Sequence, residues 1–281
     1  MSVINTNMAS LSAQTALMKT QTSLQTSMQR LSSGLRVNSA KDDAAGLAIA
    51  DAMNSQIRGM TVASRNANDG ISMAQTAEGA MGQITELFQR MRDLAVQAAN
   101  RAAVGSGDRQ KLQTEFKQLG LEVRRIVDNT TVNGKTVLKT GLSAANFQVG
   151  WSTATENQIS VTVSNFTTLS GVKSLFGNGR SIGSVAGSAS VRSVINNLDI
   201  AIGKVDTFRA TLGAAQNRFS ATISNLASAI ENQSAAKSRI MDADFASETA
   251  SLARAQVLQQ AGTAMLAQAN QLPQNVLSLL K

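Results

Sequence analysis

A seven-residue repeat of apolar side chains occupies residues 191–240, and proline is absent from all of it. The first set of repeat positions holds Val191, Leu198, Val205, Leu212, Phe219, Leu226, Gln233 and Ile240. The second set follows four residues later in each repeat and holds Ile195, Ile202, Arg209, Gln216, Ile223, Ile230 and Lys237. This pattern predicts one long helix that packs lengthwise against other helices. Its expected length is roughly 75 Å, which is more than a compact domain needs.

The first half of the chain carries a matching helical pattern. Its apolar positions are Ala50, Met53, Ile57, Met60, Ala67, Ile71, Ala74, Met81 and Phe88, joined by a second stripe of Ile84, Leu87, Met91, Leu94 and Ala98. Turn residues between Asn100 and Gly107 predict the end of this helix, with Asp108 as the cap of the next one. The next helix places Leu112, Phe116, Leu119, Val123 and Ile126 on one face.

Only the region of about residues 130–168 has a sequence typical of β-structure. Asn133-Gly134 is a typical turn pair of a two-residue hairpin. Residues 158–163 alternate polar and apolar side chains as a strand does. The composition then shifts to glycine and serine over residues 169–190. We therefore expect a small β-hairpin region followed by a short, outward-facing Gly/Ser-rich tip.

Both ends of the chain are amphipathic and carry little charge. Residues 3–35 place apolar side chains at helical spacing at Ile4, Met8, Leu11, Met18, Leu24, Met28, Leu31 and Leu35. Residues 245–280 do so at Phe245, Leu252, Leu258, Met265, Leu272, Val276 and Leu279. Full burial of one such side chain stabilises by ~1.5–3 kcal/mol. With this many apolar side chains, neither terminal helix is expected to leave its apolar face in water. Each terminal helix should pack against the other terminus and, for the rest of its apolar surface, against neighbouring subunits.

Together these patterns predict a mainly α fold. The expected architecture is an elongated antiparallel helical hairpin, or coiled-coil bundle, with the small β-hairpin region near its outer end. Polar breaks at residues 36–46 and 238–246 separate the terminal helices from the central ones. The predicted domains are the terminal helices, the helical rod with its hairpin, and the tip, at residues 1–40 with 245–281, 41–168 with 191–244, and 169–190.

The composition excludes most catalytic and metal chemistry. Cysteine and histidine are absent, so no disulfide, no Cys/His metal site and no Ser-His-Asp or Cys-His nucleophile can form. Asp42-Asp43 and the pair Asp242 and Asp244 are expected to be helix caps and inter-subunit ion pairs rather than catalytic carboxylates. We predict that the protein is not an enzyme and needs no cofactor.

The charge distribution argues against nucleic acid as a partner. The net charge is +8, but Arg124-Arg125 is the only basic doublet and aromatic residues are too few for base stacking. No stretch approaches the ~20 apolar residues of a membrane-spanning helix, so no membrane insertion is expected. The first residues lack the basic start and apolar core of a secretory signal, so no cleaved signal peptide is expected.

Three long motifs resemble the signatures of bacterial flagellin. They are Leu31–Ala50 (LSSGLRVNSAKDDAAGLAIA), Ser238–Ala246 (SRIMDADFA) and Gln260–Leu280 (QAGTAMLAQANQLPQNVLSLL). With residues 84–134 and 191–237, the resemblance covers most of the chain. It implies a subunit of the flagellar filament, secreted unfolded by the flagellar type III route. A hook–filament junction protein of the same family is the alternative.

The resemblance also implies an arrangement and a set of partners. The terminal helices would form the inner tube of the filament and the central helices the outer tube, while the variable outer domains are almost absent. Packing in the filament core would fall to Ile4, Leu11, Leu24, Leu31, Leu258, Met265, Leu272, Val276 and Leu279. The implied partners are further copies of the chain, an export chaperone at the C-terminal helix, and hook-associated and cap proteins.

A host receptor is a further implied partner. Phe88–Gln97 (FQRMRDLAVQ) matches the segment bound by a flagellin-sensing Toll-like receptor. The carried-over contacts are Gln89, Arg90, Leu94 and Glu115. Residues four apart share a helix face, so we expect an exposed patch of an arginine, a leucine and an acid. On the α-helix after Gly107 and in the turn that follows it, this chain differs from the usual family residues at three positions: Gly120, Arg124 and Val132.

Overall fold

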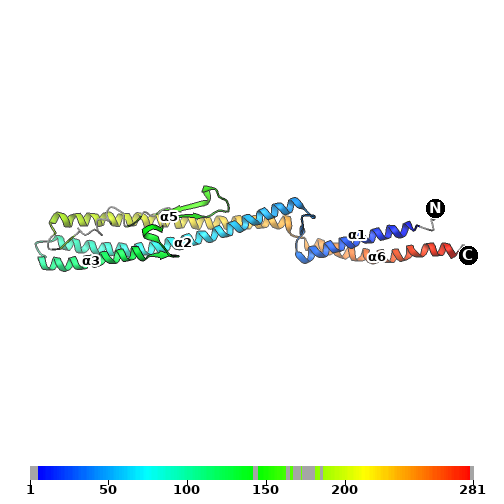
Figure 1. Cartoon of the computed structure of the whole chain (residues 1–281), viewed down its shortest axis with the longest axis horizontal. Helices are drawn as coiled ribbons and strands as arrows, with labels where there is room; N and C mark the ends of the chain where they lie inside the picture. Colours follow the sequence, from blue (N-terminus) through cyan, green and yellow to red (C-terminus); the bar gives the residue numbers. More distant parts are fainter. Residues whose placement is uncertain are drawn as a thin grey trace. The chain divides into compact units, whose positions relative to one another are not determined.

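The computed structural model of the protein describes residues 6–141, 145–162, 165–166, 172, 181–183 and 186–278. Five helices carry most of these residues: α1 (Met8–Ser33), α2 (Ala44–Ala99), α3 (Ser106–Asn129), α5 (Ser188–Met241) and α6 (Phe245–Ser278) (Figure 1). The short elements are β1 (Thr131–Val132), β2 (Lys135–Thr136), the π-helical turn η1 (Val137–Gly141), β3 (Ala145–Gln148), the 3₁₀ turn η2 (Thr155–Asn157) and β4 (Gln158–Val161). The predicted mainly α fold of long, packed helices is confirmed.

The chain divides into two compact units. The terminal unit comprises the residues up to Gln56 and those from Glu231 onward, and the central unit comprises Ile57–Ile230. The boundary falls inside α2 and α5, each of which contributes to both units.

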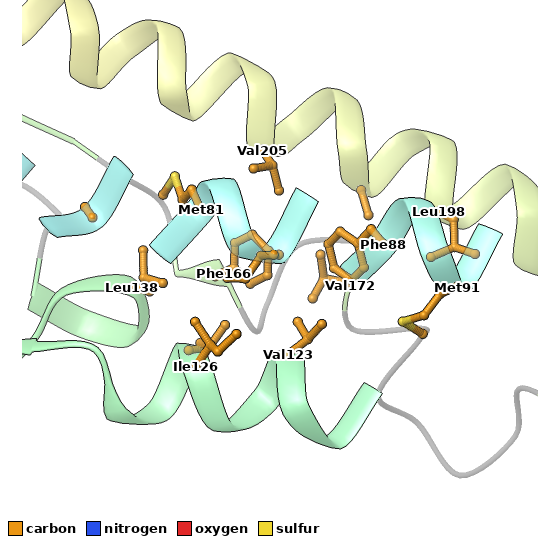
Figure 2. Packing of buried hydrophobic residues seen from close by; sticks show 14 of the residues in the cluster. Met81, Phe88, Met91, Val123, Ile126, Leu138, Phe166, Val172, Leu198 and Val205 are labelled. Atoms are coloured by element: carbon orange, nitrogen blue, oxygen red, sulfur yellow. The ribbon is translucent and has the colours of Figure 1, made fainter. Parts of the chain in front are cut away.

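Three helices form the core of the central unit, and α2 runs antiparallel to both α3 and α5. An ion pair of 2.7 Å between Arg92 Nε and Asp199 Oδ1 joins α2 to α5, and another of 2.8 Å between Arg90 Nη2 and Glu115 Oε1 joins α2 to α3. Figure 2 shows the buried side chains between these helices: Met81, Phe88 and Met91 of α2, Val123 and Ile126 of α3, Leu198 and Val205 of α5, and Leu138, Phe166 and Val172. The rings of Phe88 and Phe166 stack with centroids 6.2 Å apart.

The seven-residue repeat of α5 is buried as predicted at the first six positions of its first set, and the last two, Gln233 and Ile240, are half-buried. Val191, Leu198, Val205, Leu212, Phe219 and Leu226 are all buried. The second set is only half-buried at Ile195 and Ile202, whereas Val194 and Ala201, one residue earlier, are fully buried. The buried cluster joins α5 to residues of α2, α3 and β4. The core stripe is therefore broader than the seam of a two-helix coiled coil.

Two small antiparallel hairpins confirm the predicted β region. Asn133 and Gly134 form the turn between β1 and β2, with φ of 50° and 75°, which is the conformation that favours this residue pair. In the second hairpin β3 pairs with β4, and Phe147 lies opposite Ile159. Ile159 and Val161 face the core, as their alternation predicted.

The segment expected to form an outward tip lies largely outside the described residues. Its described residues Val172, Ile182 and Ala186 are buried against the central core, and Ile182 N–H donates to Gln113 Oε1 of α3 at 2.6 Å. At these positions the segment packs on the helices instead of projecting from them. Residues 188–190 already belong to α5.

In the terminal unit the two predicted polar breaks lie side by side. Gly34 ends α1 with a left-handed φ of 71°, a conformation that glycine adopts without strain. Arg36 N–H donates to Met241 O at 2.6 Å, and Ala243 N–H donates to Gly34 O at 3.0 Å. Two of the expected caps are confirmed, because Asp43 accepts from Gly46 N–H and Asp244 from Ala246 N–H. The prediction that Asp108 caps the next helix is wrong, because Gly105 is the N-cap of α3 and Asp108 lies in its first turn.

Asp42 organises the first break and makes it sensitive to acid. Its carboxylate accepts hydrogen bonds from Ser39 Oγ, Ser39 N–H and Asn38 N–H, and these hold the pKa of Asp42 below its ordinary value of 3.8. A lowered pKa stabilises the folded turn above pH 3.8, and this stabilisation is lost as the pH falls through the folded-state pKa. We expect Asp42→Asn to lower the hydrogen-exchange protection of the Asn38 and Ser39 amides at neutral pH. Unchanged protection would show that the carboxylate does not order the turn.

Candidate interaction surfaces

The two terminal helices pack through small side chains. Asn7 Nδ2 donates to Ala269 O at 2.7 Å, and Arg30 pairs with Glu248 at 3.8 Å, so α1 and α6 run antiparallel (Figure 1). The buried residues of this pair are Ser10, Ser27, Ala255 and Ala269. A Cβ on Gly262 would stand 3.1 Å from Leu17 Cδ1, so the glycine lets the helices approach closely.

This small-residue seam was not predicted, although the sequence carries a signal for it. Ala255, Gly262 and Ala269 follow one another at seven-residue intervals, as Ser10 and Leu17 do on α1. Such spacing marks one helix face. Because serine and glycine are not apolar, a search for hydrophobic periodicity passes over them.

Many of the large apolar side chains of α1 and α6 lie outside the seam and are exposed. Each of eight is more than half exposed: Met8, Leu11, Met18, Met28, Phe245, Val257, Leu258 and Met265. Among the residues predicted to pack in a filament core, Leu11, Leu258 and Met265 belong to this exposed surface, and Leu24 and Leu31 are half-buried. Ile4 and Leu279 lie outside the described residues, as do the side chains of Leu272 and Val276.

An exposed apolar surface of this kind indicates an interaction site. Its charge is low, since α1 carries only Lys19 and Arg30. Lys19 and Arg254 line a shallow hollow of about 270 Å³ beside Leu258, which gives the apolar surface a basic edge. We call the eight exposed side chains and this edge the apolar surface of α1 and α6.

A second surface lies on α2 and α3 of the central unit. Arg90 donates to Glu115 Oε1 through Nε at 3.0 Å and through Nη2 at 2.8 Å, and the two side chains are 57% and 43% exposed. Gln89 is also exposed. Three of the four predicted receptor contacts therefore lie at the surface, and two of them, Arg90 and Glu115, contact each other.

The prediction that Leu94 belongs to this exposed patch is wrong. Leu94 is 2% exposed and belongs to the central core. Side chains four apart on a helix differ by about 40° in direction. That difference places Arg90 outside the edge of the buried stripe and Leu94 inside it, next to Met91 and Ala95.

A groove in the central unit was not predicted. It has a volume of about 610 Å³ and lies between the loop joining β3 to β4 and helix α5, with Trp151 and Glu156 on one side and Arg218 and Asn225 on the other. Trp151 is 55% exposed. Gly59 of α2 lies beneath this residue, because a Cβ there would stand 2.9 Å from Trp151 Cβ.

Across the described ranges, no three Asp or Glu residues converge in a way that could hold a metal ion. No described helix combines the length and apolar character needed to span a bilayer.

Known families and proteins match the chain over most of its length. Residues 4–141 match the bacterial flagellin N-terminal helical region, and residues 195–280 match the bacterial flagellin C-terminal helical region. The chain is 41% identical over 279 residues to a flagellin of Halalkalibacterium halodurans, covering 99% of this chain and 100% of that protein. It is 40% identical over 289 residues to the flagellar filament 33 kDa core protein of Treponema phagedenis, with the same coverage.

Two further matches differ in extent. Flagellin A of Vibrio cholerae is 37% identical over 376 aligned residues, covering 99% of each protein. That alignment is longer than this chain because the Vibrio protein carries insertions. Among solved structures, the crystal structure of Bacillus cereus flagellin is 29% identical and covers 58% of this chain and 88% of that one, with a TM-score of 0.48.

Proposed function

Because this chain belongs to the bacterial flagellin family, we propose that it polymerises into the flagellar filament through the apolar surface of α1 and α6. A flagellin is a structural subunit of the filament and not an enzyme. The observation that carries the proposal is the exposure of large apolar side chains on these two helices while small residues fill the seam between them. Burial of each such side chain contributes ~1.5–3 kcal/mol, which drives association.

The proposed arrangement places the terminal unit in the wall of the inner tube. Met8, Leu11 and Met18 of α1, and Leu258 and Met265 of α6, would pack against neighbouring copies. The central unit would form the outer tube and leave its charged residues in solvent. In this proposal, the predicted terminal domain, residues 1–40 and 245–281, comprises the segments that are buried on assembly.

Self-assembly of the purified protein tests the proposal. The protein at high salt, seeded with short filament fragments, should give long filaments that pellet on centrifugation and are visible by electron microscopy. The junction protein of the same family predicts a different result, because such a protein caps a filament and does not extend it. Monomers that only cap added seeds would replace the filament proposal with that alternative.

The apolar surface of α1 and α6 is also the part of the chain that export and assembly partners would bind. We propose that the chain is exported unfolded by the flagellar type III route to an extracellular filament, with a chaperone covering α6 before export and hook-associated and cap proteins meeting it afterwards. The support is that Val257 and Leu258 are exposed in the subunit. Exposed apolar side chains favour aggregation unless a partner protein binds over them. A chaperone bound to α6 should protect its amides from hydrogen exchange, whereas protection of α3 alone would contradict this.

We also propose that the free subunit is recognised by the flagellin-sensing Toll-like receptor through Gln89, Arg90 and Glu115. The ion pair holds both charged side chains at the surface, and arginine is enriched among interface hot spots. Arg90→Ala and Glu115→Ala should each weaken signalling by about 30-fold, the equivalent of ~2 kcal/mol.

A matched control is Lys111→Ala. Lys111 of α3 is also exposed and ion-paired, at 3.0 Å from Asp108 Oδ1, but it is not a predicted contact. Its loss should leave signalling unchanged, and circular dichroism should show unaltered helices in all three variants. Full signalling by a subunit carrying both Arg90→Ala and Glu115→Ala would rule out this receptor site.

A further inference from the structure

Solvent exposure separates the methionines of this chain into distinct groups. Four are 57–64% exposed, and all four lie on the terminal helices: Met8, Met18, Met28 and Met265. Four others are no more than 9% exposed: Met60, Met81, Met91 and Met241. Met53 and Met73 are half-buried. The readily accessible thioethers among the described residues therefore all belong to the apolar surface of α1 and α6.

We propose that these four methionines are a site of reversible oxidation by peroxides in the free subunit, and that their sulfoxides block addition of the subunit to the filament. The inference rests on the proposed function, because it requires this surface to be buried on assembly. The partner reagent is a hydroperoxide, of which hydrogen peroxide is the simplest member.

The chemistry is a two-electron oxygen transfer. The lone pair of Sδ attacks one peroxide oxygen, an S–O bond forms and the O–O bond breaks. The sulfur is oxidised to the sulfoxide, and the departing hydroxide takes up the proton released by the transferred oxygen, giving one water per methionine. A methionine sulfoxide reductase reverses the change with two electrons and two protons from a dithiol, releasing the oxygen as water.

Oxidation turns an apolar contact into a polar one. The sulfoxide oxygen is a strong hydrogen-bond acceptor, and its burial without a donor is costly. Thr15, Thr20, Thr22 and Thr26 of α1 cannot readily supply that donor, because each hydroxyl already donates to the carbonyl four residues earlier. Thr263, close to Met265, donates to Gln260 O.

Lys19 does not remove this cost at Met18. Lys19 follows Met18 directly in the sequence, and adjacent residues on a helix point in different directions. A subunit with all four sulfoxides should therefore need at least about tenfold more protein to polymerise, since one unpaired buried oxygen suffices for that factor. Once the subunit is in a filament, its neighbours cover the sulfur atoms, so the sensitive period is the one before assembly.

Peptide mapping and assembly of the whole chain test this inference. Free subunit treated with a limiting dose of hydrogen peroxide should gain one oxygen at Met8, Met18, Met28 and Met265 before any appears at Met60, Met81 or Met91. Sedimentation should then show a critical concentration at least about tenfold higher than that of untreated subunit. Reductase with dithiothreitol should restore the original value.

Two variants provide matched controls. The variant with Met8→Leu, Met18→Leu, Met28→Leu and Met265→Leu should have the same critical concentration with and without peroxide treatment, because each preparation is compared with its own untreated sample. The variant with Met60→Leu, whose methionine is buried, should stay as sensitive as the parent. Sensitivity of the fourfold variant would overturn the inference, because the damage would then lie elsewhere.

The outcomes also separate this inference from the proposed function. If untreated subunit does not polymerise, the proposed function fails and the inference fails with it. If subunit fully oxidised at the four positions polymerises like untreated subunit, only the inference fails. Equal oxidation rates for exposed and buried methionines would contradict it without any assembly assay.

Discussion

Leu258→Asp should leave the subunit folded and raise its critical concentration for polymerisation more than about a hundredfold. Leu258 is 52% exposed in the subunit, so a change there costs little folding stability. In a filament the same position would lose the remaining half of its apolar burial, ~1 kcal/mol, and gain a desolvated carboxylate that costs several kcal/mol. A total above ~3 kcal/mol corresponds to at least two factors of ten in association. Sedimentation of seeded reactions over a range of protein concentrations measures the shift.

Two controls make this result specific to the surface. Leu258→Met keeps volume and polarity, so it should polymerise like the parent protein. Leu121 of α3 is also 52% exposed, and Leu121→Asp introduces the same charge away from α1 and α6. A comparable loss of assembly in Leu121→Asp would show that the apolar surface of α1 and α6 has no special role.

Hydrophobic periodicity predicted the central unit well for a physical reason. Leu198, Leu212 and Phe219 are large and apolar, and in this unit the chain supplies its own partners for them. The repeat therefore indicated directly which side chains are buried. It could not indicate how wide the stripe is, because burial of Val194 and Ala201 depends on how many elements surround α5.

The same reasoning selected the outer face of the terminal helices instead of their contact with each other. Leu11, Leu258 and Met265 were predicted from their apolar character, and they are exposed in the single chain. Ser10 and Ala255 form the intrachain seam because small residues allow close approach. Sequence pattern indicates that an apolar side chain needs a cover, but it does not distinguish a cover within the chain from one in another subunit.

The receptor patch shows a limit of helical spacing as a guide. Arg90 and Leu94 lie one turn apart on α2, and Glu115 lies on α3, as expected. Although the directions of Arg90 and Leu94 differ by only about 40°, Arg90 is exposed and Leu94 is buried. Only the placement of α3 and α5 around α2 fixes on which side of the edge of the buried stripe each one falls, and this placement arises from the whole core.

Helices α2 and α5 approach each other closely in the central core at a glycine. Gly70 of α2 lies against Phe219 of α5, and a Cβ at Gly70 would stand 2.7 Å from the ring atom Cζ. The ring has little freedom to move, because Phe219 is fully buried and Phe147 meets it edge-on at 5.4 Å. Gly70→Ala should therefore destabilise the protein by ~1–3 kcal/mol through overpacking, and Phe219→Ala by ~3–5 kcal/mol through the cavity it leaves.

A double-mutant cycle separates this contact from helix propensity. Gly79 of α2 has open space around its Cβ position, so Gly79→Ala should stabilise by ~0.5–1 kcal/mol, the ordinary gain from removing a helical glycine. With Phe219→Leu as background the ring is gone, and Gly70→Ala should show that same gain instead of a loss. The coupling between the two sites would then be ~1.5–4 kcal/mol by urea unfolding, in or just above the upper part of the ~0.5–3 kcal/mol range for residues in contact. Additive effects would mean that α2 and α5 relax apart at this point and that the glycine is not needed for their approach.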